Sequence, residues 1–346
     1  MRDVLPSIDR WLARGEPIAL ATVIQTWGSA PRGVGAKMAM TAGGEIAGSV
    51  SGGCVEGAVF ETGSEVLKTG RPQLLHFGVA DDTAWEVGLA CGGTIEVFVE
   101  KLDLAHYDTL RTALIEEQPA ATVTVVRGPE EYLGRTLTLF AGGEIFGALS
   151  NGPDSIATSA AREALASGES KRLTLTPPDA APLEVFVEVL LPSPTLVIVG
   201  GVHIAIALAS LAKTLGYRTI LVDPRKAFGS EARFPHVDHL IQTWPEEALA
   251  QVRLNRSTAV ATLTHDPKLD DPALRVALHS PAFYVGALGS LRTQAQRRER
   301  LAEAGFTEAQ LDRLHGPIGL SIGASTPEEI ALAVMAQIVA VRNKQI

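Results

Sequence analysis

Residues 42–53 read AGGEIAGSVSGG, and residues 141–152 read AGGEIFGALSNG. Eight of the twelve aligned positions are identical, at an offset of 99 residues. A second pair of segments, IEVFVE at 95–100 and LEVFVE at 183–188, repeats in the same order at an offset of 88. Self-similarity of this kind indicates a structural unit that occurs twice in the chain.

The repeat predicts the organisation of the N-terminal part. We expect residues 1–191 to form a duplicated α+β domain, with one copy at about residues 1–102 and the other at about 118–190. In each copy, two strands would flank the GGE turn, followed by a helix and a closing strand. The copies differ where chemistry could occur, because Gly53 is followed by a cysteine and its counterpart Gly152 by a proline.

Residues 192–194, which read PSP, predict a stiff linker, and the sequence pattern changes after them. Apolar, β-branched runs then alternate with stretches of helical periodicity; the runs lie at 195–199, 219–222, 258–263 and 282–285. Alternating strands and helices are typical of a parallel sheet that is covered on both faces. We therefore expect residues 195–346 to form a Rossmann-like domain with a doubly wound parallel sheet.

Two helices of this C-terminal part carry clear signals. The last one, at 327–342, is preceded by Thr326, whose side chain can cap the first turn. Another helix contains three arginines, which we assign to a solvated face where nearby glutamates can pair with them: Arg297, Arg298 and Arg300.

Composition and charge exclude several kinds of partner. Of the 346 residues, 46% are hydrophobic and 20% are charged, which suits a globular protein with a buried core. The formal net charge of −9 argues against nucleic acid and against anionic membrane surfaces, because both attract a positive face. The N-terminal segment lacks the apolar core of a secretion signal, and two glycines interrupt the apolar stretch at 195–212. We expect a cytoplasmic protein without a membrane span.

The sequence contains two cysteines, Cys54 in SGGCVEG and Cys91 in LACGGT, which we expect to be free thiols. Neighbouring glycines leave the backbone bare, so that a bulky ligand can approach: Gly52, Gly53, Gly92 and Gly93. A thiolate is a nucleophile and a soft metal ligand. Because the second copy lacks both cysteines, we interpret them as functional. The alternative is that both are small buried residues beside tight turns.

A loop of small residues, GSAPRGVGAK at 28–37, carries two cations. Arg32 and Lys37, together with bare backbone amides, could hold an anionic phosphate. The alternative is an ordinary hairpin connection with two solvated charges.

A Rossmann-like turn follows the first strand of the C-terminal part. Gly200 and Gly201 precede His203 at a helix start, and Asp223 ends the next strand, near the spacing of an acid that binds ribose hydroxyls. Val202, however, occupies the position of the second glycine of the dinucleotide fingerprint, and its side chain should obstruct a pyrophosphate. We expect the fold without strong dinucleotide binding; His203 could simply belong to the first helical turn.

Polar residues also follow two other predicted strands. His265 and Asp266 could act as a base and its partner, and Arg292 follows the glycines at 286–289. Ligands of doubly wound sheets bind at these strand ends. Alternatively, Asp266 only caps the turn before a proline. Together with the glycine turn, these residues make up a possible second site.

With these motifs, nearly the whole chain resembles the XdhC/CoxI family of xanthine dehydrogenase and carbon monoxide dehydrogenase accessory factors. The resemblance rests on seven segments: GSAPRGVGAKM at 28–38, GSVSGGCVEGAV at 48–59, GLACGGTIEVFVE at 88–100, VDPR at 222–225, THD at 264–266, YVGALGSLRT at 284–293 and GPIGLSIGASTPEEIA at 316–331. The set is specific, although no single segment is.

The resemblance implies a chaperone that binds molybdenum cofactor, protects it while a cysteine desulfurase sulfurates it, and delivers it to a molybdenum hydroxylase such as xanthine dehydrogenase. It further implies that Cys54 and Cys91 lie near the cofactor as possible molybdenum contacts, and that the C-terminal domain is Rossmann-like. We expect no catalytic residues of its own, a non-catalytic insertion role and a homodimer. Two positions depart from the family pattern, Val202 in place of a glycine and Ser321 in place of an aspartate, and both weigh against nucleotide chemistry.

Two other functions remain open. An NAD(P)- or FAD-dependent oxidoreductase would bind nucleotide at the Rossmann-like turn and reduce or oxidise a substrate. A pure interaction scaffold would bind no ligand, and replacing either cysteine would then have no functional effect.

Overall fold

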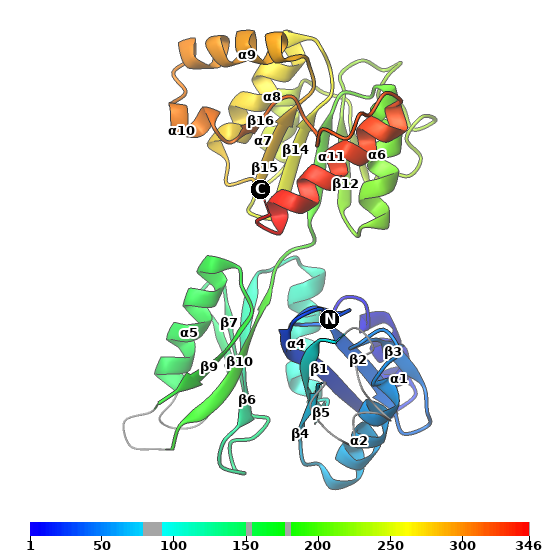
Figure 1. Cartoon of the computed structure of the whole chain (residues 1–346), viewed down its shortest axis with the longest axis vertical. Coiled ribbons are helices and arrows are strands. Elements are labelled where there is room, and N and C mark those ends of the chain that lie inside the picture. Colours follow the sequence, from blue (N-terminus) through cyan, green and yellow to red (C-terminus); the bar gives the residue numbers. More distant parts are fainter. Residues whose placement is uncertain (79–91, 150–153, 177–180, 346) are drawn as a thin grey trace. The chain divides into compact units, whose positions relative to one another are not determined.

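A computed structural model describes residues 1–78, 92–149, 154–176 and 181–345. The chain divides into two compact units, Met1–Pro192 and Ser193–Ile346 (Figure 1). Among the described residues, no helix combines the length and the apolar character that crossing a bilayer requires.

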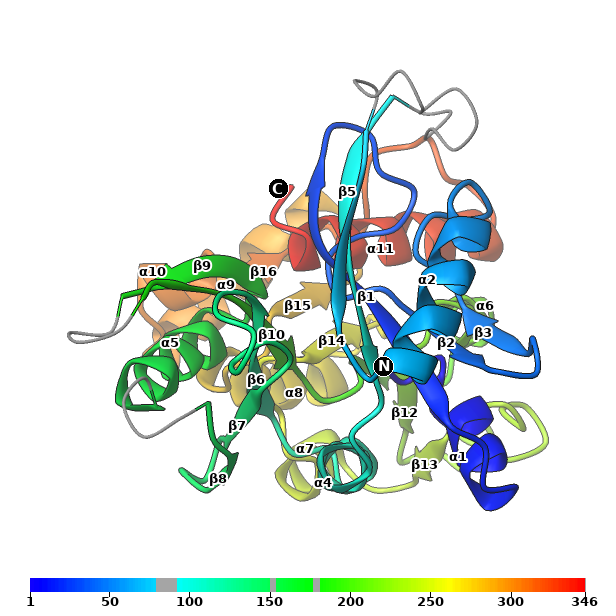
Figure 2. The ribbon, with the colours of Figure 1, turned by 90° about the horizontal axis from the view of Figure 1, so that it is seen from below.

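The first unit begins with α1 (Leu5–Ala13) and an antiparallel sheet of five strands. Its order is β3 (Ile46–Gly48), β2 (Lys37–Thr41), β1 (Ile18–Trp27), β5 (Thr94–Lys101) and β4 (Gln73–Phe77). The helix α2 (Glu56–Thr69) packs on one face (Figure 2). There Val59 and Val66 belong to one buried cluster with alternate strand residues such as Val23 and Val97. The twofold side-chain period of a strand leaves the other residues of each strand on the opposite face.

A second sheet repeats this arrangement after α4 (Leu104–Ile115). Its order is β8 (Ile145–Gly147), β7 (Thr136–Phe140), β6 (Ala120–Arg127), β10 (Leu183–Leu190) and β9 (Lys171–Leu175). The helix α5 (Asp154–Ser167) covers one face, as α2 does in the first sheet. The predicted duplicated α+β architecture is therefore present, with the same strand order in both sheets.

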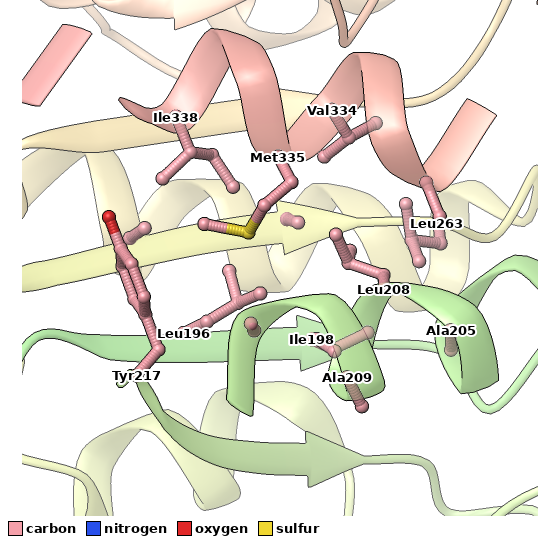
Figure 3. Packing of buried hydrophobic residues seen from close by; sticks show 14 of the residues in the cluster. Leu196, Ile198, Ala205, Leu208, Ala209, Tyr217, Leu263, Val334, Met335 and Ile338 are labelled. Carbon is pink, nitrogen blue, oxygen red and sulfur yellow. The ribbon is translucent and has the colours of Figure 1, made fainter. Parts of the chain in front are cut away.

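The second unit contains a parallel sheet of six strands. Its order is β13 (His239–Ile241), β12 (Arg218–Val222), β11 (Thr195–Val199), β14 (Thr258–Thr262), β15 (Tyr284–Ala287) and β16 (Leu314–His315). On one face α6 (His203–Thr214) and α11 (Pro327–Arg342) build a core with strand residues, including Leu196, Leu208 and Met335 (Figure 3). The opposite face is covered by α7 (Pro245–Gln251), α8 (Pro267–His279), α9 (Leu291–Glu303) and α10 (Glu308–Leu311). This confirms the doubly wound parallel sheet predicted from the alternating pattern.

Local signals account for several element ends in this unit. The apolar stretch at 195–212 forms β11, a glycine turn and the start of α6, as predicted. The helix α11 begins as predicted, because the Thr326 hydroxyl accepts from the amide of Glu329, and the Glu329 carboxylate accepts from the amide of Thr326. Such a reciprocal capping box satisfies amides that a helix start otherwise leaves without partners.

Candidate functional site

Cys54 lies in the loop that joins β3 to α2, which we call the cysteine loop (residues 49–55). Its side chain is exposed and its thiol is free. Its own amide donates to the Ser51 hydroxyl at 3.0 Å, so the backbone beneath the thiol is fixed. The alternative that both cysteines are small buried residues is therefore wrong for Cys54. Cys91 lies outside the described residues.

The cysteine loop is folded around the carboxylate of Glu56, a residue that the sequence analysis did not single out. Seven donors converge on this carboxylate: the hydroxyls of Ser49 and Ser51 and the amides of Val50, Ser51, Gly52, Gly53 and Val55. Burial alone would raise the pKa of Glu56, but these hydrogen bonds outweigh it and lower the pKa to about 2. A carboxylate that is ionised at neutral pH thus holds the loop in one shape.

The second half of the unit contains a shorter version of this arrangement. There Asp154, the first residue of α5, accepts from the amide of Leu149 at 2.7 Å. An acidic residue at the helix start also interacts favourably with the helix dipole. The carboxylate-centred loop is therefore part of the repeated scaffold, and the thiol at Cys54 is what distinguishes the first copy. An acidic residue shortly after a GG or NG pair in both copies, three positions after Gly53 and two after Gly152, was the sequence signal for Glu56.

Two other glycine-containing segments lie against each other beside the cysteine loop. A Cβ atom added at Gly93 would lie 2.4 Å from the carbonyl oxygen of Ser29, and one at Gly28 would lie 3.5 Å from the Cα of Gly93. A Cβ at Gly52 would lie 3.8 Å from the Cβ of Pro31. The loop before β2, the cysteine loop and the glycine pair ahead of β5 therefore lie together, and the last of these directly follows Cys91 in the chain.

The positions of the candidate site require glycine for different structural reasons. Gly52, Gly53 and Gly92 have φ angles of +83°, +120° and +73°, which side chains rarely adopt. The amides of Gly52 and Gly53 already donate to Glu56, so they are not bare donors for a ligand, which differs from our expectation. Among the described residues other than its chain neighbours, however, a Cβ at Gly53 or Gly92 would meet no atom within 4 Å. Gly93 instead permits close packing.

Arg32 and Lys37 were predicted to hold a phosphate together, but the structure gives them different surroundings. Arg32 is half-buried, with 41% of its side chain exposed, and it pairs with Asp3 at 3.2 Å, so the side chain stays partly accessible to an anion. Lys37 is wrongly assigned to a phosphate-binding loop, because it is the first residue of β2 and its side chain is only 5% exposed. Its ammonium donates to Glu188 at 2.9 Å and to Thr22 at 3.0 Å, and these contacts fix it inside the unit.

In the second unit, groups of the protein take up the hydrogen bonds at the turn after β11, where a nucleotide was considered. The carboxylate of Asp223 accepts from the guanidinium of Arg225 at 2.7 and 2.9 Å and from the amide of Gly201 at 2.7 Å. Burial opposes ionisation of Asp223, but these hydrogen bonds lower its pKa. The acid expected to bind ribose hydroxyls is therefore ionised and paired with Arg225. The sequence analysis had not identified Arg225 as its partner.

The segment 225–233 also covers the glycine turn. A Cβ added at Gly201 would lie 2.5 Å from the carbonyl oxygen of Phe228, and the guanidinium of Arg233 donates to the Gly201 carbonyl at 2.6 Å. Gly200 packs as closely, since its Cβ would lie 2.4 Å from a methyl carbon of Thr264. Val202, expected to obstruct a pyrophosphate, packs against the hydrophobic core instead. The obstacle at this turn is therefore the chain segment after β12.

The remaining residues of the possible second site are dispersed among ordinary structural positions. His203 and Arg292 are exposed residues in the first turns of α6 and α9. The carboxylate of Asp266 caps α8 by accepting from the amide of Lys268 at 2.9 Å, which is the alternative that the sequence had left open. His265 is exposed beside it.

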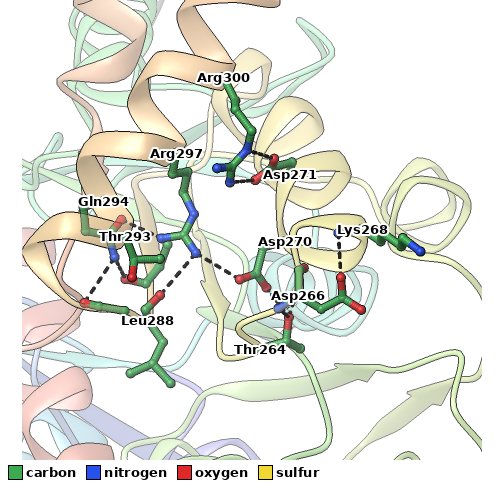
Figure 4. Close-up of polar contacts among 12 residues, drawn as sticks. Thr264, Asp266, Lys268, Asp270, Asp271, Leu288, Thr293, Gln294, Arg297 and Arg300 are labelled. Carbon is green, nitrogen blue, oxygen red and sulfur yellow. Dashed lines mark hydrogen bonds and ion pairs between the residues drawn. The ribbon is translucent and has the colours of Figure 1, made fainter.

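A buried polar network lies near these strand ends (Figure 4). Arg297 is 2% exposed and donates to the carboxylate of Asp270 at 3.0 Å and to the carbonyl of Leu288 at 3.2 Å. Asp270 also accepts from the hydroxyl of Thr264 at 2.6 Å, and burial raises its pKa to about 6. The assignment of Arg297 to a solvated helix face is therefore wrong. Within the described parts of the chain, no cluster of three or more His, Cys, Asp or Glu side chains could hold a metal ion.

Known proteins resemble this chain along nearly its whole length. Residues 196–338 match the family described as the XdhC Rossmann domain, and residues 11–78 match the XdhC and CoxI family. The chain is 30% identical over 342 residues to a probable xanthine dehydrogenase subunit of Bacillus subtilis, covering 97% of each protein. It is 27% identical over 343 residues to the molybdenum cofactor insertion chaperone PaoD of Escherichia coli, covering 96% of this chain and 86% of PaoD.

A solved structure has the same fold. A Bacillus halodurans protein described as a xanthine dehydrogenase superimposes with a TM-score of 0.75 at 24% identity, over 99% of this chain and 96% of that one. The class defined by the fold is thus a duplicated α+β unit followed by an XdhC-type Rossmann domain. This chain belongs to the XdhC and CoxI family.

Proposed function

We propose that this protein is an accessory factor that binds molybdenum cofactor, supports its sulfuration and delivers it to a molybdenum hydroxylase of the xanthine dehydrogenase type. The observation that carries the proposal is the exposed, free Cys54 thiol on a loop that seven hydrogen bonds to Glu56 hold in shape. The names of its relatives, a xanthine dehydrogenase subunit and a molybdenum cofactor insertion chaperone, support the same reading.

The chemistry of the cysteine loop suits such a cargo. Molybdenum cofactor is an anionic pterin phosphate that carries a soft, sulfur-bound metal. A thiolate is a soft ligand, and it is also the nucleophile that can attack the outer sulfur of a carrier's persulfide, taking over that sulfur while the carrier leaves as a thiolate. No described residue beyond the chain neighbours lies within 4 Å of a Cβ at Gly53 or Gly92, which supports a bulky cargo beside the loop. Cys91, next to Gly92 in the chain, is proposed as the second thiol.

Arg32 is the cation that we propose for the phosphate of the cargo. Its present partner, Asp3, is 47% exposed and Arg32 itself is 41% exposed. An exposed ion pair of this kind contributes only about 0–1 kcal/mol, so a phosphate can replace the carboxylate with little loss. Lys37 has no part in this proposal, because its ammonium is bound to Glu188.

The proposed function predicts that the cargo is held at the protein surface, not in a closed cavity. The cysteine loop is exposed at Gly52, Gly53 and Cys54. A loop site can release a bound group without opening the core, whereas deeply buried ligand pockets enclose most of the ligand surface. A delivery protein requires such release, because a partner enzyme takes the cargo over.

The test measures retention of molybdenum cofactor on a desalting column under anaerobic conditions. We expect wild type to retain the cofactor and Cys54→Ala to lose most of it while remaining folded. Ser155→Ala, at the start of the corresponding helix α5 in the second half, is the matched control and should retain it. Equal retention by wild type and by the double variant Cys54→Ala, Cys91→Ala would refute the proposal.

A further inference from the structure

A cavity of about 640 Å³ lies between the two sheets of the first unit, away from the faces that α2 and α5 cover. Both halves contribute to its lining, and its polar side chains include Thr22, Lys37, Glu100, Thr124, Thr136 and Glu188. Its volume is within the usual range of small-molecule sites, about 300–1,000 Å³. The proposed function uses none of these groups.

The internal duplication relates the two sides of this cavity. Lys37 pairs with Thr22 in the first sheet, and Thr136 pairs with Thr124 at the equivalent place in the second. The closing strands of the two copies supply Glu100 and Glu188, which are the last residues of the repeated hexapeptide.

The two glutamates are reciprocally placed. A Cβ added at Gly35, in the first copy, would lie 3.8 Å from a carboxylate oxygen of Glu188, which belongs to the second copy. A Cβ added at Gly134, in the second copy, would lie 3.9 Å from a carboxylate oxygen of Glu100, which belongs to the first copy. Each carboxylate therefore lies near the equivalent glycine of the opposite copy.

The charges on the two sides are not equivalent. Glu188 receives a hydrogen bond from the ammonium of Lys37 at 2.9 Å. For Glu100 the equivalent position holds Thr136, which carries no charge. Within the described residues, the Glu100 carboxylate has no hydrogen bond or ion pair. Burial raises its pKa to about 7, although Lys37 acts in the opposite direction. One of two related acidic positions thus lacks its cation.

Among the described residues, the other basic groups on the cavity wall make no hydrogen bond or ion pair with Glu100. The N-terminal ammonium of Met1 pairs with Asp3 at 3.4 Å, and Lys101 is exposed. The guanidinium of Arg135 donates to the carbonyl of Leu149 at 3.2 Å and lies over the ring of Tyr132. His106 has a pKa that burial lowers, and its ring nitrogen lies 3.3 Å from the hydroxyl of Thr138. A histidine with a lowered pKa is neutral at pH 7.

The cavity also has an apolar wall. Phe98 and Phe186, at equivalent positions of the two copies, are buried in one cluster with Ile24 and Val126. Aromatic side chains of this kind favour a flat apolar group beside them. The lining therefore combines an aromatic wall with three acidic residues, Glu100, Asp103 and Glu188, and with hydroxyls, and of the two related glutamates Glu188 is the one paired with Lys37.

We propose that this cavity binds a small organic cation, with an amidinium or ammonium group opposite Glu100 and an aromatic or apolar body against Phe98 and Phe186. The cationic nitrogen would occupy the place that Lys37 Nζ has on the related side, and the hydroxyl of Thr136 would accept a further N–H bond. Charge-assisted hydrogen bonds of an amidinium to a carboxylate are stronger than neutral ones and can be bidentate. A bare metal ion fits less well, because Glu100 is a single carboxylate and a divalent cation needs several oxygen ligands.

The test uses benzamidine, which is a cation at neutral pH, titrated calorimetrically into the full chain at about pH 8, where a carboxyl with a pKa near 7 is ionised. We expect saturable binding at one site, at least tenfold weaker binding by Glu100→Gln, and no binding of the uncharged analogue benzamide. Cys54→Ala should bind benzamidine as wild type does, which separates this outcome from failure of the proposed function.

Thr136→Lys provides a second, independent variant. A lysine at position 136 would restore the ion pair that the related side has, so we expect it to abolish benzamidine binding and to raise the melting temperature. The proposal is overturned by absence of saturable benzamidine binding to wild type at millimolar concentration. Unchanged binding by Glu100→Gln or by Thr136→Lys would overturn it equally.

Discussion

At the scale of single residues, the carboxylate of Glu56 fixes the shape of the cysteine loop from inside. Glu56 lies at the start of α2, yet its carboxylate is turned back into the cysteine loop. An ionised carboxylate that accepts several amide hydrogen bonds stabilises a backbone shape that short loops do not hold alone. Cys54 is therefore presented by a rigid support, although it is exposed.

We predict that Glu56→Gln destabilises the protein by about 1–3 kcal/mol at pH 7, because the amide replaces a charged acceptor and adds an unwanted donor. The pKa of Glu56 is depressed to about 2 from 4.5, so its contribution is complete above the unfolded value and is lost as pH falls through the folded value. Urea unfolding at a series of pH values measures this. The difference from wild type should shrink between about pH 4.5 and pH 2; a difference independent of pH would contradict the role of the charge.

We also predict that Gly53→Val weakens cofactor retention and lowers stability by at least about 1–2 kcal/mol, because Gly53 has a φ of +120°. The matched control is Gly57→Ala, three residues after Cys54 on α2, where an added Cβ meets nothing within 4 Å. Alanine in a helix should be neutral or stabilise by about 0.5–1 kcal/mol. Thermal unfolding and retention of the cofactor are measured for both variants, and equal behaviour would argue against strain at Gly53.

At the scale of elements, local sequence signals predicted where the helix α11 begins, but they did not predict that the Arg297 side chain is buried. The cap at Thr326 predicted the start of α11, because capping depends only on neighbouring residues. The surroundings of Arg297 could not be predicted in this way, because its partner Asp270 lies on another helix. A run of arginines on a helix is usually solvated, and only the three-dimensional contact distinguishes the one that is not.

The buried pair leads to a prediction with a control on the same helix. Arg297→Leu leaves Asp270 without its partner in the core and should cost about 3–5 kcal/mol. Arg298→Leu removes surface ion pairs with Glu308 and Asp312 and should cost at most about 1 kcal/mol. Urea unfolding measures the free energy of unfolding of both variants. Similar decreases for Arg297→Leu and Arg298→Leu would contradict a special contribution of the buried ion pair.

The turn after β11 leads to a prediction about nucleotides. We expect calorimetric titration to detect no binding of NAD, NADP or FAD at micromolar concentration, because Arg225 holds the carboxylate of Asp223 and Phe228 lies against Gly201. Low-micromolar affinity for any of the three would refute this. It would also favour an oxidoreductase over an accessory factor.

At the scale of the whole molecule, comparison of the two repeats was the most informative step from sequence. It predicted that the first copy is special, because Cys54 has a proline as its counterpart. The same comparison could have revealed Lys37 against Thr136, but the sequence does not show that Glu188 reaches Lys37 from the other copy. The position of a strand in a repeat is predictable, whereas the contact between repeats requires the fold.

The last prediction concerns the action of the protein on another enzyme. The sequence has two cysteines, fewer than the four thiolates that an iron–sulfur cluster normally needs, so these cysteines do not supply such a cluster. We therefore expect no substantial turnover of purines or aldehydes by the purified protein. Deleting it should leave a molybdenum hydroxylase client that is folded but inactive, lacking the terminal sulfur, the cofactor or both.

Activity and sulfurated cofactor content of the isolated client measure this role together. Complementation with Cys54→Ala should fail to restore both, whereas complementation with Glu100→Gln should restore both, because the Glu100 cavity is not part of the proposed delivery site. A fully active client from the deletion strain would show that delivery does not depend on this protein. Robust xanthine turnover by the protein alone would mean that the catalytic role had been assigned to the wrong chain.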